Sequence, residues 1–364
     1  MNKKSVAGLA AVIAFALVFA TCEPIDKISG SGSGNNGKKV VIYSVGSYWD
    51  GSDYNACYWR GTERVELPVP LGVGGSYACA ITVAGETVYT AGYYDWGDFG
   101  RKPCYWQGTE RIDLPVPSDA EYSYAYAIAV AEGMVYTAGS YGEDMWDVKA
   151  CYWRGTERII DLPTPSGGTG REAEAITVVG GTVYTAGSYD GDYDTKACYW
   201  QGTEPIDLPV PLGMDSWAIA ITVAGGTVYT AGSYVDDSWE LKVLCYWRGT
   251  ERIDLSVPSG ADHPYSHTSA IAVAEGTVYT AGSYVVYPVT KACYWRGTER
   301  IDLPVPSDAE YSYAYAIAVE GGTVYTAGEY LDGSGGKICY WENGSLHDIG
   351  PVDGEIYNSF IHFE

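Results

Sequence analysis

One short motif recurs along the chain at a nearly constant spacing. The tripeptide CYW begins at Cys57, Cys104, Cys151, Cys198, Cys245, Cys293 and Cys339, with steps of 47, 47, 47, 47, 48 and 46 residues. A second motif, VYTAG or a variant of it, recurs in register with the first, and residues 108–130 and 297–319 are identical. A chain of 364 residues built in this way gains length by repeating a unit, not by enlarging a single core.

Each repeat contains four short stretches that predict β-strands. In their commonest form they read AIAV, TVYTAGSY, KACYWRG and TERIDLPV, and Gly, Pro or Asp residues separate them. The connections AGGT and RGTE are short and contain glycine, as antiparallel hairpins require. A four-stranded antiparallel sheet every 47 residues is typical of one propeller blade. We therefore expect an all-β fold, a seven-bladed β-propeller of four-stranded antiparallel blades.

The two ends of the repeat array predict that the blades form a ring. The first repeat begins at residue 40 with VVIYSVGSY and lacks the AIAV strand, whereas EIYNSFIHFE, residues 355–364, follows the seventh repeat. An open solenoid would need polar caps, but a ring removes its exposed strand edges by pairing its ends. We expect the C-terminal strand to join the N-terminal blade and to close a propeller that spans residues 40–364.

The first 39 residues predict export and attachment to a membrane. Lys3 and Lys4 precede an apolar run, residues 6–20, that is too short to span a bilayer comfortably. The following FATC resembles the lipobox of bacterial lipoproteins, with Thr21 where Gly or Ala is usual. The expected division is a lipoprotein-type signal peptide (1–21), lipidation of Cys22, and a flexible Ser/Gly-rich tether (22–39). The alternative is an ordinary secretory signal with an incidental cysteine.

The repeat also resembles a known family. The stretches AYAIAV, GTVYTAGSY and ACYWRGTERIDL, and above all CYWENGSLHDIG (residues 339–350), resemble the HAF repeats of bacterial extracellular proteins. The likeness covers residues 40–364, although this chain has Ala-Val and Tyr-Thr-Ala where the family more often has Asn and Val-Gly. The resemblance implies a secreted β-propeller and no defined activity. Together with the signal, it places the expected protein in the bacterial cell envelope, held by its lipid at the outer membrane or cell surface.

Charge and motif content narrow the expected partners and chemistry. The formal net charge of −24 disfavours nucleic acid and anionic lipid surfaces as partners of the folded body. The repeated cysteines lack CxxC spacing and a recurring His, so we interpret them as small buried residues. We interpret the tryptophan of each CYW as packing between blades. GxSxG, HExxH and SxDxGxTW motifs are all missing from the sequence, so we expect no enzyme activity. We also expect a monomer without a cofactor.

The repeats differ from one another in two loops, and these predict the ligand site. In a four-stranded meander, the loop after the second strand and the link to the next blade emerge on the same face. Tyr, Trp and Asp gather there, as is typical of binding surfaces on a fixed scaffold. The candidate ligand-binding residues are Trp49, Asp50, Tyr94, Asp95, Trp96, Trp146, Asp192, Tyr193, Asp237 and Trp239.

The function expected from this face is binding of a protein or glycan ligand. The alternatives are an envelope assembly scaffold, a carbohydrate-active enzyme, or acidic turns that only keep the ring soluble. One loop also has alternating acids, Asp190, Asp192 and Asp194, which make it a candidate Ca²⁺ site, although the glycine and distant glutamate of a calcium loop are missing.

Overall fold

The structure, a computed structural model, describes residues 39–97, 100–144, 147–165, 168–235, 242–259 and 261–364. These residues form 28 β-strands, and none of them is helical. Accordingly, the described part of the chain contains no helix long and apolar enough to cross a membrane. The all-β prediction is confirmed.

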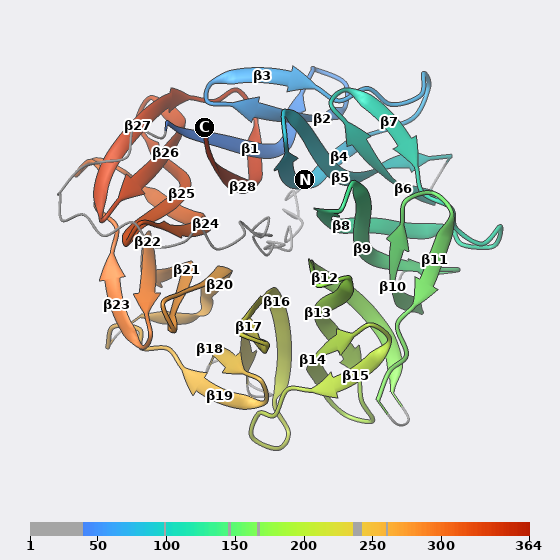
Figure 1. The fold of residues 1–364 in the computed structure, drawn as a ribbon. Helices are drawn as coiled ribbons and strands as arrows, with labels where there is room; N and C mark the ends of the chain where they lie inside the picture. The colour runs from blue at the N-terminus through green and yellow to red at the C-terminus, as the bar shows by residue number, and fades with distance from the viewer. Residues whose placement is uncertain (1–38, 98–99, 145–146, 166–167, 236–241, 260) are drawn as a thin grey trace, which may run out of the picture.

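The strands group into seven four-stranded antiparallel units arranged around a common centre (Figure 1). Unit 1 consists of β28 (Glu355–Phe363), β1 (Val40–Trp49), β2 (Tyr54–Arg60) and β3 (Glu63–Glu66). Unit 2 consists of β4 (Ser76–Ala84), β5 (Thr87–Trp96), β6 (Gly100–Gln107) and β7 (Glu110–Asp113). Unit 3 consists of β8 (Tyr122–Ala131), β9 (Met134–Gly142), β10 (Val148–Arg154) and β11 (Arg158–Asp161). Unit 4 consists of β12 (Thr169–Val179), β13 (Thr182–Asp190), β14 (Thr195–Gln201) and β15 (Glu204–Asp207).

The remaining units follow the same order. Unit 5 consists of β16 (Asp215–Ala224), β17 (Thr227–Val235), β18 (Lys242–Arg248) and β19 (Glu251–Asp254). Unit 6 consists of β20 (Asp262–Ala274), β21 (Thr277–Val286), β22 (Val289–Arg296) and β23 (Glu299–Asp302). Unit 7 consists of β24 (Tyr311–Glu320), β25 (Thr323–Asp332), β26 (Gly335–Glu342) and β27 (Ser345–Pro351). One parallel bridge joins β6 to β8 (Arg101 with Tyr122), and another joins β22 to β24 (Thr290 with Tyr311), so units 2 and 3, and units 6 and 7, form eight-stranded sheets.

The two ends of the array share the sheet of unit 1. Strand β28 pairs with β1 in antiparallel register, and the Oγ atoms of Ser44 and Ser359 lie 2.9 Å apart across this pairing. Lys39 and Glu364 add two reciprocal backbone hydrogen bonds of 2.9 Å. Around the centre, β24 contacts β28 and β28 contacts β4. The orphan pieces at the two ends of the sequence therefore complete one unit between them.

Each innermost strand has a β-bulge at the same place. The register shifts between Ala78 and Ala80 in β4, and it shifts at the equivalent position of every other innermost strand. The glycine of VYTAG faces this bulge: a Cβ on Gly92 would lie 2.0 Å from the carbonyl oxygen of Tyr77. The glycine is therefore required by the close approach of two backbones.

The repeated tryptophans hold neighbouring units together. All seven are fully buried, and the Trp153 indole N–H donates to the carbonyl oxygen of Pro115, in the link that precedes its own unit, at 2.7 Å. The same bond recurs between Trp200 and Pro163 and between Trp341 and Pro304, each at 2.7 Å. The CYW cysteines are buried and free. Repetition of the motif thus reproduces one joint between units.

Candidate functional site

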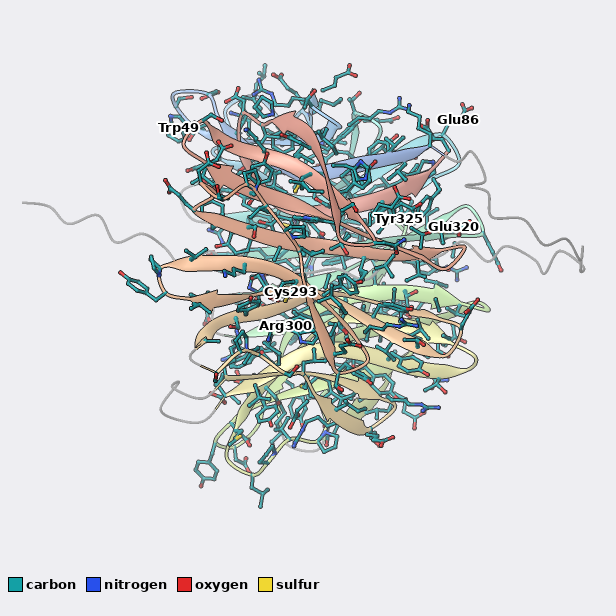
Figure 2. All side chains as sticks on the ribbon, turned by 90° about the vertical axis from the view of Figure 1, so that its left-hand side faces the viewer. Trp49, Glu86, Cys293, Arg300, Glu320 and Tyr325 are labelled. Atoms are coloured by element: carbon teal, nitrogen blue, oxygen red, sulfur yellow. The ribbon has the colours of Figure 1, made fainter. Side chains whose placement is uncertain are left out.

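The two variable loops lie on one face of the ring, as expected from the strand order. The backbone N–H of Asp95, near the end of β5 in unit 2, donates to the carbonyl oxygen of Gly75 in the preceding link at 2.8 Å. Figure 2 shows Trp49 at this face, and it shows Glu86 and Glu320 at the opposite face. Both glutamates come from the hairpins that vary little between repeats. We call the face that carries Trp49 the loop-variable face.

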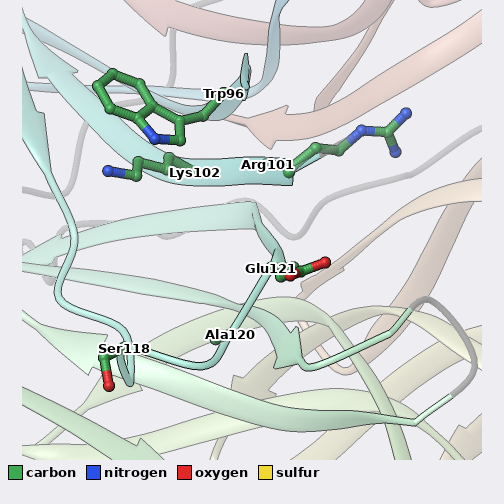
Figure 3. A pocket seen from close by; sticks show the side chains of 7 residues that line it. Trp96, Arg101, Lys102, Ser118, Ala120 and Glu121 are labelled. Carbon is green, nitrogen blue, oxygen red and sulfur yellow. The ribbon is translucent and has the colours of Figure 1, made fainter. Parts of the chain in front are cut away.

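A depression on the loop-variable face lies between units 2 and 3. It has a volume of about 440 Å³, and its polar lining comes from Arg101, Lys102, Ser118 and Glu121. Trp96 forms its apolar wall with 47% of its surface exposed, and the Lys102 Nζ lies 3.9 Å from the indole centroid (Figure 3). The depression therefore offers an accessible aromatic ring beside several hydrogen-bonding groups.

Arg101 connects this depression to the centre of the ring. Its Nη1 donates to the Tyr124 hydroxyl at 2.7 Å, and its Nε pairs with Asp95 at 3.3 Å. Its guanidinium also lies 5.4 Å from the centroid of Tyr93. Burial raises the pKa of the Tyr124 hydroxyl, and the neighbouring guanidinium opposes that shift. Two ring systems and a carboxylate therefore fix the position of Arg101.

A continuous series of aromatic rings runs from the surface toward the centre. Successive centroids lie 5.2, 6.1, 5.2 and 5.0 Å apart along Trp49, Tyr54, Tyr77, Tyr93 and Tyr124. We call these five residues the aromatic row. Trp49 is 56% exposed, Tyr54, Tyr77 and Tyr93 are half-buried, and Tyr124 is buried. The row therefore presents accessible ring surface in units 1 and 2 and ends at the buried Tyr124 of unit 3.

Several residues expected from the sequence lie where a ligand could reach them. Besides Trp49 and Trp96, the exposed set includes Tyr193, which is fully exposed, and Asp192. Asp50 is also exposed, but it closes its own loop by accepting hydrogen bonds from the backbone N–H groups of Ser52 and Asp53 at 2.8 and 3.0 Å. Those bonds hold the pKa of the Asp50 carboxyl well below its usual range.

The structure corrects the prediction that Tyr94 is an accessible ligand-binding residue. It is 1% exposed, and burial raises the pKa of its hydroxyl to about 12, with Asp113 adding to the shift. The equivalent Tyr189 donates to Asp207 at 2.8 Å, so this tyrosine is a repeated structural residue in the units. Its neighbour Tyr93 is the ring that joins the aromatic row.

The candidate calcium loop has other partners in the structure. Asp190 accepts a hydrogen bond from the Arg171 side chain and another from the Thr195 hydroxyl, and Asp194 lies 3.5 Å from the Lys196 Nζ. In the described ranges, no group of three or more His, Cys, Asp or Glu residues is arranged to hold a metal ion. The calcium site at Asp190, Asp192 and Asp194 therefore stays a prediction. Four other predicted residues lie outside the described residues: Cys22, Trp146, Asp237 and Trp239.

The sequence analysis missed the residues at the centre of the ring. Tyr126 donates to Glu172 at 3.0 Å, and Tyr315 donates to Glu329 at 2.7 Å. Tyr126, Glu172 and Tyr315 lie in innermost strands, and Glu329 lies in the strand next to one. The sequence analysis looked for variable residues only in the loops. A signal was present in the first strand of most repeats, which contains two alanines separated by one residue, as in ACA (78–80) and AYA (125–127). The residue between the alanines changes from repeat to repeat.

Comparison with known proteins supports the fold. Neither a protein-family model nor a curated protein sequence matches the chain, so the HAF resemblance stays a prediction. A prolyl endopeptidase structure is similar over 88% of this chain and 49% of its own, with a TM-score of 0.50 and 11% identity. A Trypanosoma rangeli sialidase mutant is similar over 76% of this chain and 56% of its own (TM-score 0.45, 9% identity). A PL25 ulvan lyase is similar over 74% and 81% (TM-score 0.47, 9% identity). This chain is thus a β-propeller protein, and it spans about half the length of the sialidase and the endopeptidase.

One structural neighbour also corrects an expectation. The chain was expected not to be an enzyme, but the prolyl endopeptidase, which resembles its fold with a TM-score of 0.50, is an enzyme. The expectation rested on missing sequence motifs, and such motifs do not describe sites assembled from several units of a ring. At identities of 9–11%, the likeness establishes the fold alone and assigns no activity to this chain.

Proposed function

We propose that this protein binds a glycan on the loop-variable face, across the aromatic row and the depression beside Trp96. The observation that carries the proposal is the row itself, in which centroid spacings of 5.0 to 6.1 Å give a nearly continuous aromatic surface. Sugar rings present C–H faces that pack against aromatic rings, while their hydroxyls need donors and acceptors nearby. Asp95, Arg101 and Glu121 supply such groups beside the row.

The arrangement favours a glycan over a protein ligand. A protein interface of standard size buries about 800 Å² on each partner and needs a broad patch. Here the adjoining rings and the depression are confined to units 1, 2 and 3, whereas the exposed Tyr193 and Tyr287 lie in the separate units 4 and 6. A narrow aromatic surface of this kind suits an extended chain of sugars.

Binding can be tested with a glycan array followed by titration of the best polysaccharide. We expect Trp49→Ala and Tyr77→Ala each to weaken binding about tenfold, which corresponds to about 1.4 kcal/mol. Tyr287→Ala is the matched control, because Tyr287 is 84% exposed and lies outside the row. Equal affinity in all three variants, or an array without any bound glycan, would exclude this proposal.

The second candidate function is a carbohydrate-active enzyme that uses the same surface. It is favoured by the two carboxylates beside the depression, Asp95 and Glu121. Shortening of a bound polysaccharide by the wild type, with loss of that activity in Asp95→Asn or Glu121→Gln while binding persists, would support it. Binding without any turnover across the array would reduce the function to recognition.

We further propose that Cys22 carries a lipid and that residues 22–39 tether the propeller to the cell envelope. The support is the FATC stretch at the end of the apolar run. Two or three acyl chains anchor a protein stably, whereas one is marginal. Incorporation of labelled palmitate into the wild type, and its loss in Cys22→Ala, would test the anchor; label that persists in the variant would contradict it.

A further inference from the structure

Two junctions between neighbouring units have the same local structure. The links that lead into units 3 and 7 belong to the identical stretches 108–130 and 297–319. One parallel bridge joins the two units at each of these junctions, and among the described residues no other pair of units is joined in this way. The junction between units 2 and 3 and the junction between units 6 and 7 are therefore alike in sequence and in backbone pairing.

Each of these two junctions contains a depression. The depression between units 6 and 7 has a volume of about 470 Å³, close to the 440 Å³ of the depression beside Trp96, and we call it the second depression. Both volumes lie in the range of about 300–1,000 Å³ that is usual for small-ligand sites. The two linings share a lysine, a serine and an alanine at equivalent positions: Lys102, Ser118 and Ala120 in the first, and Lys291, Ser307 and Ala309 in the second.

Tyr311 gives the second depression an aromatic wall. Its ring is half-buried and lies 5.3 Å from the ring of Tyr313, which stacks on Tyr315 at 6.0 Å. The equivalent rings at the first junction, Tyr124 and Tyr126, stack in the same way at 5.4 Å. Because its neighbours support the Tyr311 ring, a ligand that packs on this ring meets a surface that is already in place.

The second depression also has polar groups that a ligand can reach. Lys291 and Ser307 are exposed and Thr290 is half-buried, and all three line the depression. Asp302, another lining residue, already accepts a hydrogen bond from the Arg300 Nε at 2.7 Å. The second depression therefore places an accessible aromatic ring beside an ammonium group and two hydroxyls, the combination that sugar rings and their hydroxyls require.

The two depressions differ in the strand that precedes the variable hairpin. Tyr93 and Trp96 of β5 correspond to Ser283 and Val286 of β21, since both strands have ten residues and begin at the same point of the repeat. The aromatic row therefore has no counterpart beside the second depression. A glycan bound there would contact fewer rings, so we expect the second depression to bind more weakly than the first.

We propose that the second depression is a second glycan site on the loop-variable face, in which Tyr311 packs on a sugar ring while Lys291 and Ser307 bond to its hydroxyls. This inference rests on the proposed glycan-binding function. The formal net charge of −24 favours a neutral glycan over a polyanionic one. Figure 1 places β6 and β8 on the opposite side of the ring from β22 and β24. A polysaccharide long enough to reach both sites would therefore bind more tightly than a short oligosaccharide.

The test is calorimetric titration of the full chain with three neutral hexasaccharides: cellohexaose, laminarihexaose and maltohexaose. We expect at least one of them to bind at two sites on each chain. Lys291→Met and its matched variant Lys102→Met should each weaken one site about tenfold and leave the other unchanged. Tyr311→Ala should act like Lys291→Met. Tyr287→Ala is the control, because Tyr287 lies in the hairpin next to the second depression but does not line it.

The outcomes separate this proposal from the proposed function. One hexasaccharide per chain, bound equally well by the wild type and Lys291→Met, would overturn the second site and leave the aromatic row in place. A loss in Tyr287→Ala as large as that in Tyr311→Ala would also overturn it. Lys291→Met changes an exposed side chain, so it decides the question even if Tyr311→Ala does not fold. Binding that Lys291→Met weakens and Trp49→Ala leaves unchanged would support the second site alone, and no binding of any hexasaccharide would overturn both proposals.

Discussion

The pH dependence of the free energy of unfolding in Glu329→Gln tests how the Glu329 carboxyl affects stability. Burial raises the pKa of Glu329 from 4.5 to about 7; the bond from Tyr315 lowers it, and Glu355 raises it. This pKa difference of about 2.5 units, at about 1.4 kcal/mol per unit, means that ionisation of Glu329 lowers the free energy of unfolding by at most about 3 kcal/mol. Because Glu329 is only half-buried, we expect about 2 kcal/mol.

The sign of the effect follows from the raised pKa. Below pH 4.5 the carboxyl is protonated in both folded and unfolded chains, so its contribution to stability is fully present. As the pH rises through about 7, the unfolded chain has already released the proton, so the free energy of unfolding falls by the amount above. Glutamine does not titrate, and its amide oxygen can still accept the bond from Tyr315. The variant should therefore lose less stability than the wild type between pH 4 and pH 8.

Urea denaturation at a series of pH values measures this difference directly. The exposed Glu86→Gln variant is the control and should follow the wild type. A Glu329→Gln variant whose stability falls with pH as steeply as that of the wild type would refute the reasoning.

Three further predictions concern a joint between units, a buried cysteine and a buried valine. Trp153→Phe should lower the free energy of unfolding by about 2 kcal/mol, because it leaves the buried Pro115 carbonyl without its donor; a loss under about 0.5 kcal/mol in urea denaturation would contradict this. Burial raises the pKa of the Cys151 thiol well above its usual range, so a thiol reagent at pH 8 should modify Cys151 only after unfolding, as mass spectrometry of the labelled peptides can show. Val235→Asp places a carboxylate at a position that is 0% exposed in unit 5 and should destabilise the fold by about 3 kcal/mol or more, whereas an unchanged thermal midpoint would show that unit 5 repacks.

The architecture could be predicted because the sequence repeats it. A period of 47 residues with four strand-like stretches leaves few alternatives, and the missing first strand of unit 1 shows where the last strand must pair. The burial of Trp153 and its equivalents followed from alternation along a strand. The position of the variable loops on one face followed from strand order alone.

The candidate site was less predictable, because it depends on which side chain of a strand faces inward. In the stretch AGYYD, Tyr93 and Tyr94 are adjacent, and strand periodicity alone does not assign them to a face. Aligning the repeats would have shown that Tyr94 matches the tyrosine of AGSY and that Tyr93 replaces its serine. The bulged residues of the innermost strands were harder to see, because each of the seven strands contributes only one of them.

The pairing of β28 with β1 has a consequence for biosynthesis. Strand β1 is made early, yet its inner partner is separated from it by more than 300 residues. Until β28 has emerged from the ribosome, the inner edge of β1 stays available to other strands. The nascent chain therefore needs protection at that edge, and a chaperone that holds it would do so until translation of the last nine-residue strand is complete.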